Sequence, residues 1–332
     1  MLLLVPTVSL LCGFASALLA SSSAARCGFQ THVARGCDEP GHYGKTVSLK
    51  MTRSWSPAAT IVPVKKSADI LAFTSYLGAT ATQVTLLIAA LHGLQLKVIP
   101  VLPTGSLFTL PSPPIINIPN LPTKLSLIGN RLSQVGEELA LGSSLANLAV
   151  FFLFLFLAVR SRIFSPLDNS RPSTSNNDPV FKGRLRPWFQ PPPIAFPFIW
   201  STIAFLRAIS TTIIFNTTGT LLCTPIFALA LHLSIGDTWN TINNVERRMG
   251  TAAFTVPAVL GSAAYVYYSM AQINKVASWV IAPMVAWLSV ATCLVFSIWR
   301  INYKLAGAPS LFPCKEEGPP SRWRIPFTSL SR

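Results

Sequence analysis

The strongest constraint on the fold of this chain is a series of apolar segments of similar length in its C-terminal half. They cover residues 139–159, 195–215, 221–243, 251–271 and 276–301. Each is close to the roughly 20 apolar residues that a helix needs to cross the hydrocarbon core of a bilayer. Because backbone polar groups must pair internally in lipid, repeated segments of this length predict a bundle of five membrane helices.

The composition agrees with a polytopic membrane protein. Of 332 residues, 51% are hydrophobic and 11% are charged, whereas soluble domains carry about 25% charged residues. The net charge is +15, and a basic chain is a candidate for nucleic-acid binding. Here, however, the basic residues gather in loops and tails, so we expect no nucleic-acid partner.

The loop charges support the same division into spans. The loops after the first and third segments and the C-terminal tail are rich in Arg and Lys. In the other two loops, Lys275 is the single charged residue. Basic residues that alternate in step with the spans follow the positive-inside rule. The basic loops and the tail are therefore predicted to share one side, which corresponds to cytoplasm or stroma.

Motifs for metal binding and catalysis are not found. The six cysteines form no C-x-x-C pair and the four histidines are scattered. The sequence contains no nucleophile elbow, H-E-x-x-H helix, phosphate-binding loop or dinucleotide fingerprint. We therefore predict no metal site, no catalytic residue and no obligatory cofactor.

The N-terminal part divides by composition. Residues 1–66 begin with an apolar, small-residue stretch and continue with a basic, Ser/Thr-rich stretch, which is typical of a signal followed by a transit segment. The alternative is that residues 1–66 are a disordered basic tail without a targeting role. Residues 67–96 form a hydrophobic helix that could span the membrane or lie against the domain, and 97–138 form a Pro-rich linker. The membrane domain covers 139–303, and 304–332 form a basic tail.

A rigid loop precedes the second apolar segment. It runs from Leu185 to Pro193 and ends in three consecutive prolines. Proline fixes φ and has no N–H donor, so this run cannot lie within a helix and holds one shape. An ordered aromatic loop at this position predicts a lid or wall for an apolar ligand, formed by Pro187, Trp188 and Phe189.

The loop and the last apolar segment resemble the TspO/MBR family, which includes the tryptophan-rich sensory proteins and the translocator proteins. The loop and the segment after it match at Leu185, Pro187, Pro191, Pro192, Phe196 and Trp200, with Arg186 and Phe189 replacing a Lys and a Trp. The last segment matches at Pro283, Trp287, Ala291, Leu294, Trp299 and Asn302, and the third at Trp239. The resemblance covers about residues 139–302 and implies a five-helix membrane fold.

The residues also differ from the family pattern at several positions. Met284 replaces a Tyr, Val295 an Asn, His232 a Gln and Gly236 an Asn. Because the replaced amides belong to the polar pocket of the family, these changes bear on which ligand is bound.

Three ionisable residues lie within the apolar segments: Arg207, His232 and Asp237. Ionisable groups at such depth are costly unless they are paired or functional. Arg207 could form a structural ion pair with Asp237, or its guanidinium could await a ligand carboxylate. His232 could also be an axial haem ligand, although the family pocket is not known for axial ligation.

The resemblance implies a protein that binds tetrapyrroles such as protoporphyrin IX or haem, or similar flat ligands such as sterols, for buffering, transport or stress-linked regulation. The alternatives are a light-dependent porphyrin-degrading enzyme and a structural scaffold whose pocket has decayed. We expect a homodimer in a plastid membrane, or else a mitochondrial membrane or endomembrane. The predicted ligand-binding residues are Pro187, Trp188, Phe189, Trp200, Arg207, His232, Asp237, Trp239, Pro283, Trp287, Ala291 and Leu294.

Overall fold

The computed structural model describes residues 66–97, 129–131, 133–136, 145–168, 184–303, 309–317 and 321–324. Within these ranges the chain forms helices and two isolated antiparallel bridges, without a strand. The predicted leader, 1–66, lies outside the described residues except for Lys66, as do most of the predicted linker and parts of the predicted tail.

Six long helices build the described part of the chain. They are α2 (Ile70–Lys97), α4 (Leu145–Arg160), α6 (Ala195–Thr218), α7 (Thr224–Asn240), α8 (Met249–Ile273) and α9 (Lys275–Asn302), with three short turns, η2 (Ser161–Phe164), η3 (Thr241–Val245) and η4 (Lys315–Glu317). By length and composition, α2, α4 with η2, α6, α8 and α9 could each cross a membrane. Helix α7 has 17 residues and continues directly into the π-helical turn η3. The predicted all-α membrane fold is confirmed.

Local sequence explains several helix ends. Helix α6 ends at Gly219, which adopts a left-handed φ of 68° that glycine accepts without steric cost. Helix α7 has Pro225 in its first turn, where a missing N–H costs no hydrogen bond. Helix α9 is capped by Asn274, whose side chain accepts hydrogen bonds from the backbone N–H groups of Val276 and Ala277.

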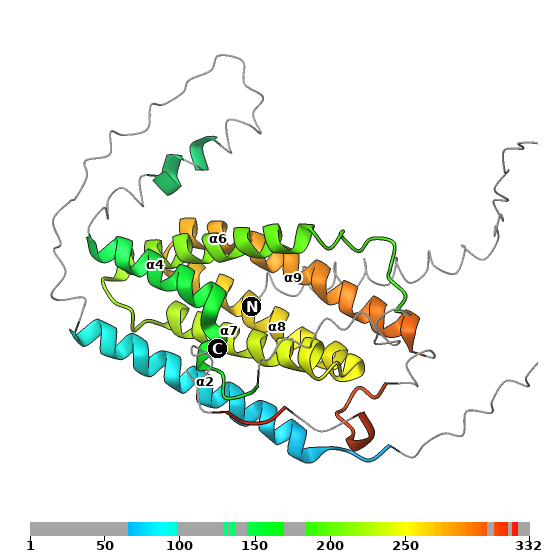
Figure 1. Cartoon of the computed structure of the whole chain (residues 1–332). Coiled ribbons are helices and arrows are strands. Elements are labelled where there is room, and N and C mark those ends of the chain that lie inside the picture. The colour runs from blue at the N-terminus through cyan, green and yellow to red at the C-terminus, as the bar shows by residue number, and fades with distance from the viewer. Residues whose placement is uncertain are drawn as a thin grey trace, which may run out of the picture. The chain divides into compact units, whose positions relative to one another are not determined.

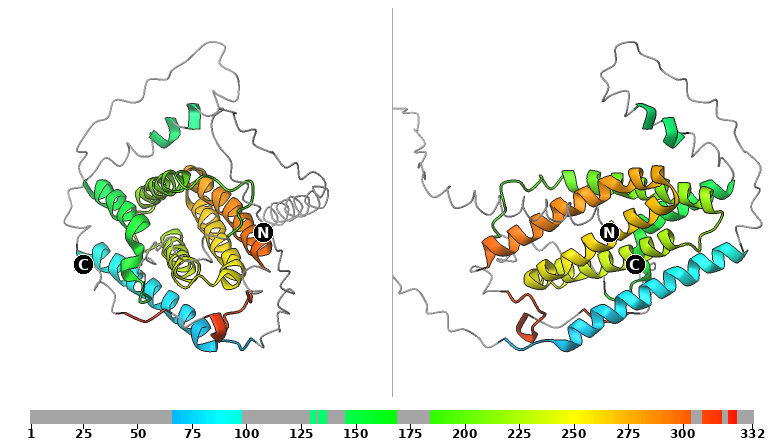
Figure 2. Two further views of the ribbon diagram at one scale, coloured as in Figure 1. Left: turned by 45° about the vertical axis from the view of Figure 1, so that its right-hand side comes forward. Right: turned by 180° about the vertical axis from the view of Figure 1, so that it is seen from behind.

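The long helices pack side by side as a bundle (Figure 1). Helix α4 packs on α6, α6 on α9, α9 on α8, α8 on α7, and α7 on α2. The left view of Figure 2 looks nearly along the helices and shows α2 on the outside of the other five. We call the end at which α4 and α9 finish the basic end, because its loops carry the arginines, and the end with the α6–α7 turn the opposite end.

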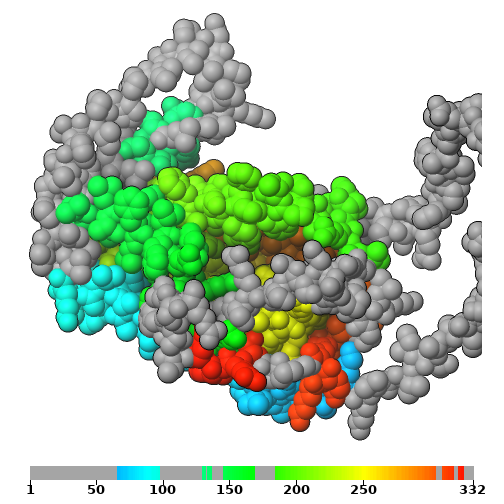
Figure 3. Space-filling view, viewed as in Figure 1, coloured from blue at the N-terminus to red at the C-terminus, as the bar shows by residue number. Residues whose placement is uncertain are grey.

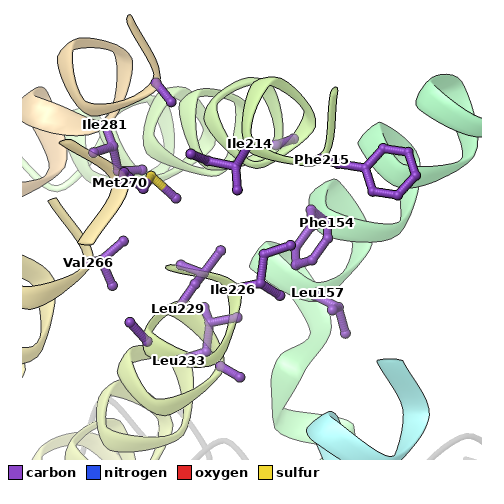
Figure 4. Close-up of a cluster of buried hydrophobic side chains, with 14 of the residues drawn as sticks. Phe154, Leu157, Ile214, Phe215, Ile226, Leu229, Leu233, Val266, Met270 and Ile281 are labelled. Atoms are coloured by element: carbon purple, nitrogen blue, oxygen red, sulfur yellow. The ribbon is translucent and has the colours of Figure 1, made fainter. Parts of the chain in front are cut away.

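The hydrophobic core fills the half of the bundle near the opposite end. Figure 4 shows part of it, with side chains of neighbouring helices in contact. Its side chains come from α4 along its length, from the C-terminal halves of α6 and α8 and from the N-terminal halves of α7 and α9, and include Phe154, Ile214, Phe215, Ile226, Leu229, Val266, Met270 and Ile281. Lipid is as apolar as this core, so close packing rather than water exclusion holds these helices together. We call this closely packed half of the bundle the solid plug.

Helix α2 is attached to the bundle at both of its ends. At its start, Asp69 caps the helix through the N–H of Ala72 and pairs with the fully buried Arg248 at 3.2 Å. Near its end, the Gln95 side chain accepts a hydrogen bond from the backbone N–H of Leu221 at 2.7 Å. Leu221 lies in the α6–α7 turn at the opposite end. Helix α2 therefore runs the whole length of the bundle, starting at the basic end.

The C-terminal segment folds back across the basic end. Cys314 forms an isolated backbone β-bridge with Ala68 beside the start of α2, and Trp323 forms another with Leu167 after η2. Figure 3 shows residues 321–324 next to η2 and α2. The segment also approaches α8 closely, because a Cβ atom on Gly250 would lie 2.1 Å from the carbonyl oxygen of Ser310. Only glycine fits at this contact.

Candidate ligand-binding site

A large cavity occupies the other half of the bundle, between the solid plug and the basic end. Its volume is about 1470 Å³, which exceeds the roughly 300–1,000 Å³ of most small-molecule pockets. Helices α6, α7, α8 and α9 supply its walls, and the end of α4, η2, η3 and residues 322–324 line its mouth. The site is thus built from the family-like helices together with the C-terminal segment.

Aromatic side chains form much of the wall. Trp200, Trp239, Trp287 and Phe196 all line the cavity. Phe196 contacts Trp287 edge to face, with ring centroids 6.0 Å apart, and Trp239 donates its indole N–H to the carbonyl of Ala252 at 2.9 Å. The indole N–H of Trp287 is buried and has no acceptor among the described residues. A buried donor without a partner is costly, so this group suits a ligand acceptor.

Arg207 forms the floor of the cavity with two neutral partners. It lies twelve residues into α6, about 18 Å along the helix axis from Ala195, and only 8% of it is exposed. Its Nη2 lies 2.9 Å from Nε2 of His232, and its Nε donates to the sulfur of Met284 at 3.1 Å. Within the described chain no carboxylate lies within 4 Å of the guanidinium.

The chemistry of these contacts fixes the tautomer of His232. A guanidinium has only donors, so Nε2 of the imidazole must accept from Arg207. The proton then lies on Nδ1, which faces the hydroxyl of Ser262 at 2.9 Å, and that hydroxyl donates onward to the carbonyl of Val259 at 2.8 Å. His232 is therefore neutral, and its Nε2 lone pair is engaged by Arg207 rather than open to a metal.

Asp237 pairs away from Arg207, so of the two alternatives for Arg207 the ion pair between these two residues is not formed. Its carboxylate accepts from Ser161 at 2.5 Å and from the Gln83 side chain at 2.7 Å, and it lies 3.5 Å from Nε of Arg162. The reason is helical geometry: five residues advance an α-helix by about 140° beyond one full turn. His232 therefore faces α6 and α8, whereas Asp237 faces η2 and α2.

The rigid loop before α6 is held by the end of α9. The Asn302 side chain accepts from the backbone N–H of Leu185 at 2.8 Å and donates to the carbonyl of the same residue at 2.9 Å. Two hydrogen bonds to the backbone of one residue fix both its position and its orientation. The matching residues of the two family-like motifs thus contact each other directly.

The cavity brings together eight of the twelve sequence-predicted residues: Trp200, Arg207, His232, Asp237, Trp239, Trp287, Ala291 and Leu294. Pro187, Trp188, Phe189 and Pro283 do not line it. Trp188 is 88% exposed and packs edge to face on Phe189 at 5.7 Å, because the turn at 188–189 directs its ring outward. The loop contributes Gln190 to the wall instead. Pro283 lies one helical turn before Trp287 in α9 and is exposed on the outside of the helix.

Sequence reasoning missed the residues at the mouth. These are mainly arginines and asparagines: Arg160, Arg162, Arg184, Asn240, Asn243, Asn244, Arg322 and Arg324. The alternation of basic loops placed most of the arginines on one side of the membrane, but no spacing rule aims a loop side chain at a cavity. The contribution of the C-terminal segment depends on contacts with η2 and α2, which are distant in sequence.

The fold and the cavity define an all-α membrane protein with a large, aromatic-lined cavity at the basic end of its bundle. Residues 144–300 match the model of the TspO/MBR family. This segment is thus a TspO/MBR-type domain, and the resemblance seen in the two sequence motifs is confirmed. Helix α2 and the segment at 309–324 lie outside the matched residues.

Individual relatives agree with the family match. The chain is 25% identical to the translocator protein of Homo sapiens over 134 residues, which are 40% of this chain and 79% of that protein. It is 25% identical to the tryptophan-rich sensory protein of Cereibacter sphaeroides over 36% of this chain and 73% of the relative. It is 23% identical to the tryptophan-rich protein TspO of Bacillus cereus over 47% of this chain and 97% of that relative.

Proposed function

We propose that this membrane protein binds tetrapyrroles of the protoporphyrin or haem type, or similarly flat apolar ligands such as sterols, in the cavity above Arg207. Binding would serve buffering, transport or stress-linked regulation. The observation that carries the proposal is a cavity of about 1470 Å³ whose aromatic walls end on a buried guanidinium. A flat apolar molecule with an acidic edge matches both features.

The walls suit an aromatic macrocycle. Indole rings stack on flat π-systems and contribute roughly 0.5–1.5 kcal/mol beyond the burial of area. Trp200, Trp239 and Trp287 lie on three different helices around one space. Trp287 also offers its unpartnered N–H to an acceptor on the ligand.

The floor suits a carboxylate. An arginine buried in the membrane is costly unless an anion compensates its charge. His232 and Met284 orient Arg207 but leave its charge uncompensated. A propionate that reaches the floor would accept charge-assisted hydrogen bonds from the guanidinium. Both neutral partners occupy positions at which this chain differs from the family pattern, which favours a specialised pocket over a decayed one.

The test is a titration of the full chain in phosphatidylcholine nanodiscs with protoporphyrin IX, followed by tryptophan fluorescence. We expect saturable quenching that weakens in Arg207→Gln and in Trp287→Leu. Absence of saturable quenching by protoporphyrin IX and haem, together with no binding of a radiolabelled sterol, would reject the proposal and leave the scaffold alternative.

The enzyme alternative has one observation in its favour, namely three indoles on the wall of one cavity that could act as redox partners. It predicts light-dependent loss of bound porphyrin in oxygenated samples, and this loss should be blocked by Trp→Phe changes at the cavity. A carrier would return the porphyrin unchanged after illumination.

The proposed site of action is a plastid membrane, where tetrapyrroles are made. It rests on the composition of residues 1–66 alone. N-terminal sequencing of the protein from membranes should show a start beyond Ala25. An intact Met1 would return this segment to the mature protein and remove the support for plastid import.

A further inference from the structure

The mouth of the cavity carries an excess of positive charge. Its lining contains five arginines and two aspartates: Arg160, Arg162, Arg184, Arg322, Arg324, Asp168 and Asp237. We call these five arginines the basic mouth. Asp237 is already engaged by Arg162, Gln83 and Ser161. The aspartates therefore leave several of the arginines uncompensated.

Two of these arginines have donors that are closed off from solvent and lack an acceptor. The Nε–H of Arg184 and that of Arg324 are buried without a hydrogen-bond partner in the part of the chain that the structure describes. Burial and the neighbouring charge of Arg186 both lower the pKa of Arg184. A bound anion would favour the charged form of Arg184 and so would raise its pKa. It could also accept two hydrogen bonds from the bidentate edge of the guanidinium.

The basic mouth lies at a different level from the floor. His232, beside Arg207, and Asp237, beside Arg162, are five residues apart on α7, which is about 7–8 Å along the helix axis. Arg324 lies beside Arg162, because its Nη2 donates to the Arg162 carbonyl at 3.2 Å. Arg184 precedes Leu185, which Asn302 holds at the end of α9, so it also lies at the basic end. The cavity therefore presents cations at two levels that are on the order of 10 Å apart along its axis.

We propose that the basic mouth is a second anion subsite, and that the preferred ligand carries acidic groups at two opposite edges of a flat apolar body. One acidic group would reach Arg207 at the floor, and the other would bind Arg184 and Arg324 at the mouth. This inference rests on the proposed function and narrows its ligand class. A tetrapyrrole with an acidic group on every pyrrole ring, of the coproporphyrin type, meets the requirement. Protoporphyrin IX has both acids on one edge and can satisfy only one level.

The test compares two porphyrins on the full chain in phosphatidylcholine nanodiscs. Coproporphyrin III and protoporphyrin IX, each with its methyl ester, are titrated by tryptophan fluorescence. We expect coproporphyrin III to bind about tenfold more tightly than protoporphyrin IX, the gain of one charge-assisted contact. The preference should disappear in Arg184→Gln/Arg324→Gln, whereas Arg207→Gln should weaken both acids.

Matched variants control for charge and folding. Arg300→Gln removes one exposed arginine at the same end of α9, outside the cavity lining, and should leave the preference unchanged. Arg184→Lys/Arg324→Lys keeps the charge but loses the bidentate edge, and should keep only part of the preference. Melting temperatures of all variants separate a lost contact from a lost fold.

The outcomes distinguish the two proposals. Failure of both porphyrins and both esters to bind would reject tetrapyrrole binding, the part of the proposed function on which this inference rests. Binding of both acids with equal affinity, or a preference that persists in Arg184→Gln/Arg324→Gln, would overturn the second subsite alone. Loss of the preference when phosphatidylglycerol is added to the nanodiscs would assign the basic mouth to a lipid headgroup and would also overturn it.

Discussion

Arg207 donates a hydrogen bond to His232 across the floor of the cavity, from Nη2 to Nε2 at 2.9 Å. The pair joins α6 to α7 at the boundary between the solid plug and the cavity. A neutral imidazole orients the guanidinium without neutralising it, in contrast to the carboxylate of an ion pair. The cation therefore keeps its charge for a ligand.

The first prediction concerns His232. Replacing it by Gln should preserve the selectivity for protoporphyrin IX over its dimethyl ester, because an amide oxygen can accept from Arg207. Replacing it by Leu should reduce this selectivity several-fold, since Arg207 then loses the acceptor that positions it. Affinities come from fluorescence titration of both ligands. Equal behaviour of the Gln and Leu variants would show that His232 does not position the guanidinium.

A second prediction separates Arg207 from Asp237. Arg207→Leu should retain the thermal stability of the protein, because Asp237 keeps its contacts with Arg162 and Gln83. Arg162→Leu should lower the stability, since it removes the cation from a buried carboxylate. Melting temperatures in detergent test both variants. A large loss in Arg207→Leu that is recovered in Arg207→Leu/Asp237→Leu would restore the ion pair that the structure lacks.

A third prediction concerns the wall. Trp287→Leu should weaken the binding of protoporphyrin IX about tenfold, because stacking contributes up to roughly 1.5 kcal/mol. Trp287→Phe should cost less, since it keeps a ring but removes the N–H. Trp279 lies on the same helix and is 57% exposed outside the cavity, so Trp279→Leu is the matched control. Equal loss in the two Leu variants would indicate a general effect on α9.

A fourth prediction uses the contact between Gly250 and Ser310. Gly250→Ala should displace residues 309–317 from α8, because the new Cβ would lie 2.1 Å from a backbone oxygen. Hydrogen exchange in this segment should rise. Gly261 lies on the same helix with nothing within 4 Å of its Cβ position, so Gly261→Ala should leave the exchange unchanged. Protection in Gly250→Ala at the level of the unmodified protein would exclude the close contact.

A fifth prediction is a pH dependence at the attachment of the C-terminal segment to α2. Ser67 donates to Glu316 through its hydroxyl at 2.7 Å and through its backbone N–H, and this holds the pKa of Glu316 below its usual value of 4.5. Because the folded-state pKa is lowered, the carboxylate stabilises the attachment above about pH 4.5 and loses this effect as pH falls through the folded-state pKa. The protection factor of the Ser67 amide, which is the intrinsic exchange rate divided by the observed rate at the same pH, should therefore fall in acid, and Glu316→Gln should remove this dependence.

The position of α2 gives a topological expectation. Impermeant maleimide should label Lys97→Cys from the side opposite to Arg300→Cys, and Lys66→Cys from the same side, in a cysteine-free background. The reason is that α2 is anchored at the basic end by Asp69 and at the opposite end by Gln95. Labelling of both α2 positions from one side would mean that the helix does not cross the membrane.

Local sequence predicted the helices well where apolar length decides them. The last segment, predicted at 276–301, is observed at Lys275–Asn302. The third, predicted at 221–243, begins only at Thr224, because Cys223 is extended and Pro225 starts the helix. Leu221 is apolar and buried but lies in a turn that Gln95 completes. Hydropathy alone cannot distinguish such a residue from a helical one.

The site was predictable only in part, for a related reason. Motif matches identified wall residues such as Trp239 and Trp287 because those residues lie on regular helices with a known period. The partners of Asp237 come from α2 and η2, and Gln83 is 154 residues away in sequence. Pairing over such distances depends on how helices dock, which no local pattern encodes. Trp188 was predicted in the wall but points outward, because a turn and not a helix sets the direction of its side chain.

The double hydrogen bond between Asn302 and Leu185 has a practical consequence for recombinant work. The family match stops at residue 300, so a protein cut at that point would lose Asn302 and, with it, the hold on the loop before α6. It would also lose Trp323 and the two arginines beside it. Shortened proteins should therefore extend beyond Arg324, and a fluorescent reporter is better fused after Arg332 than after α9.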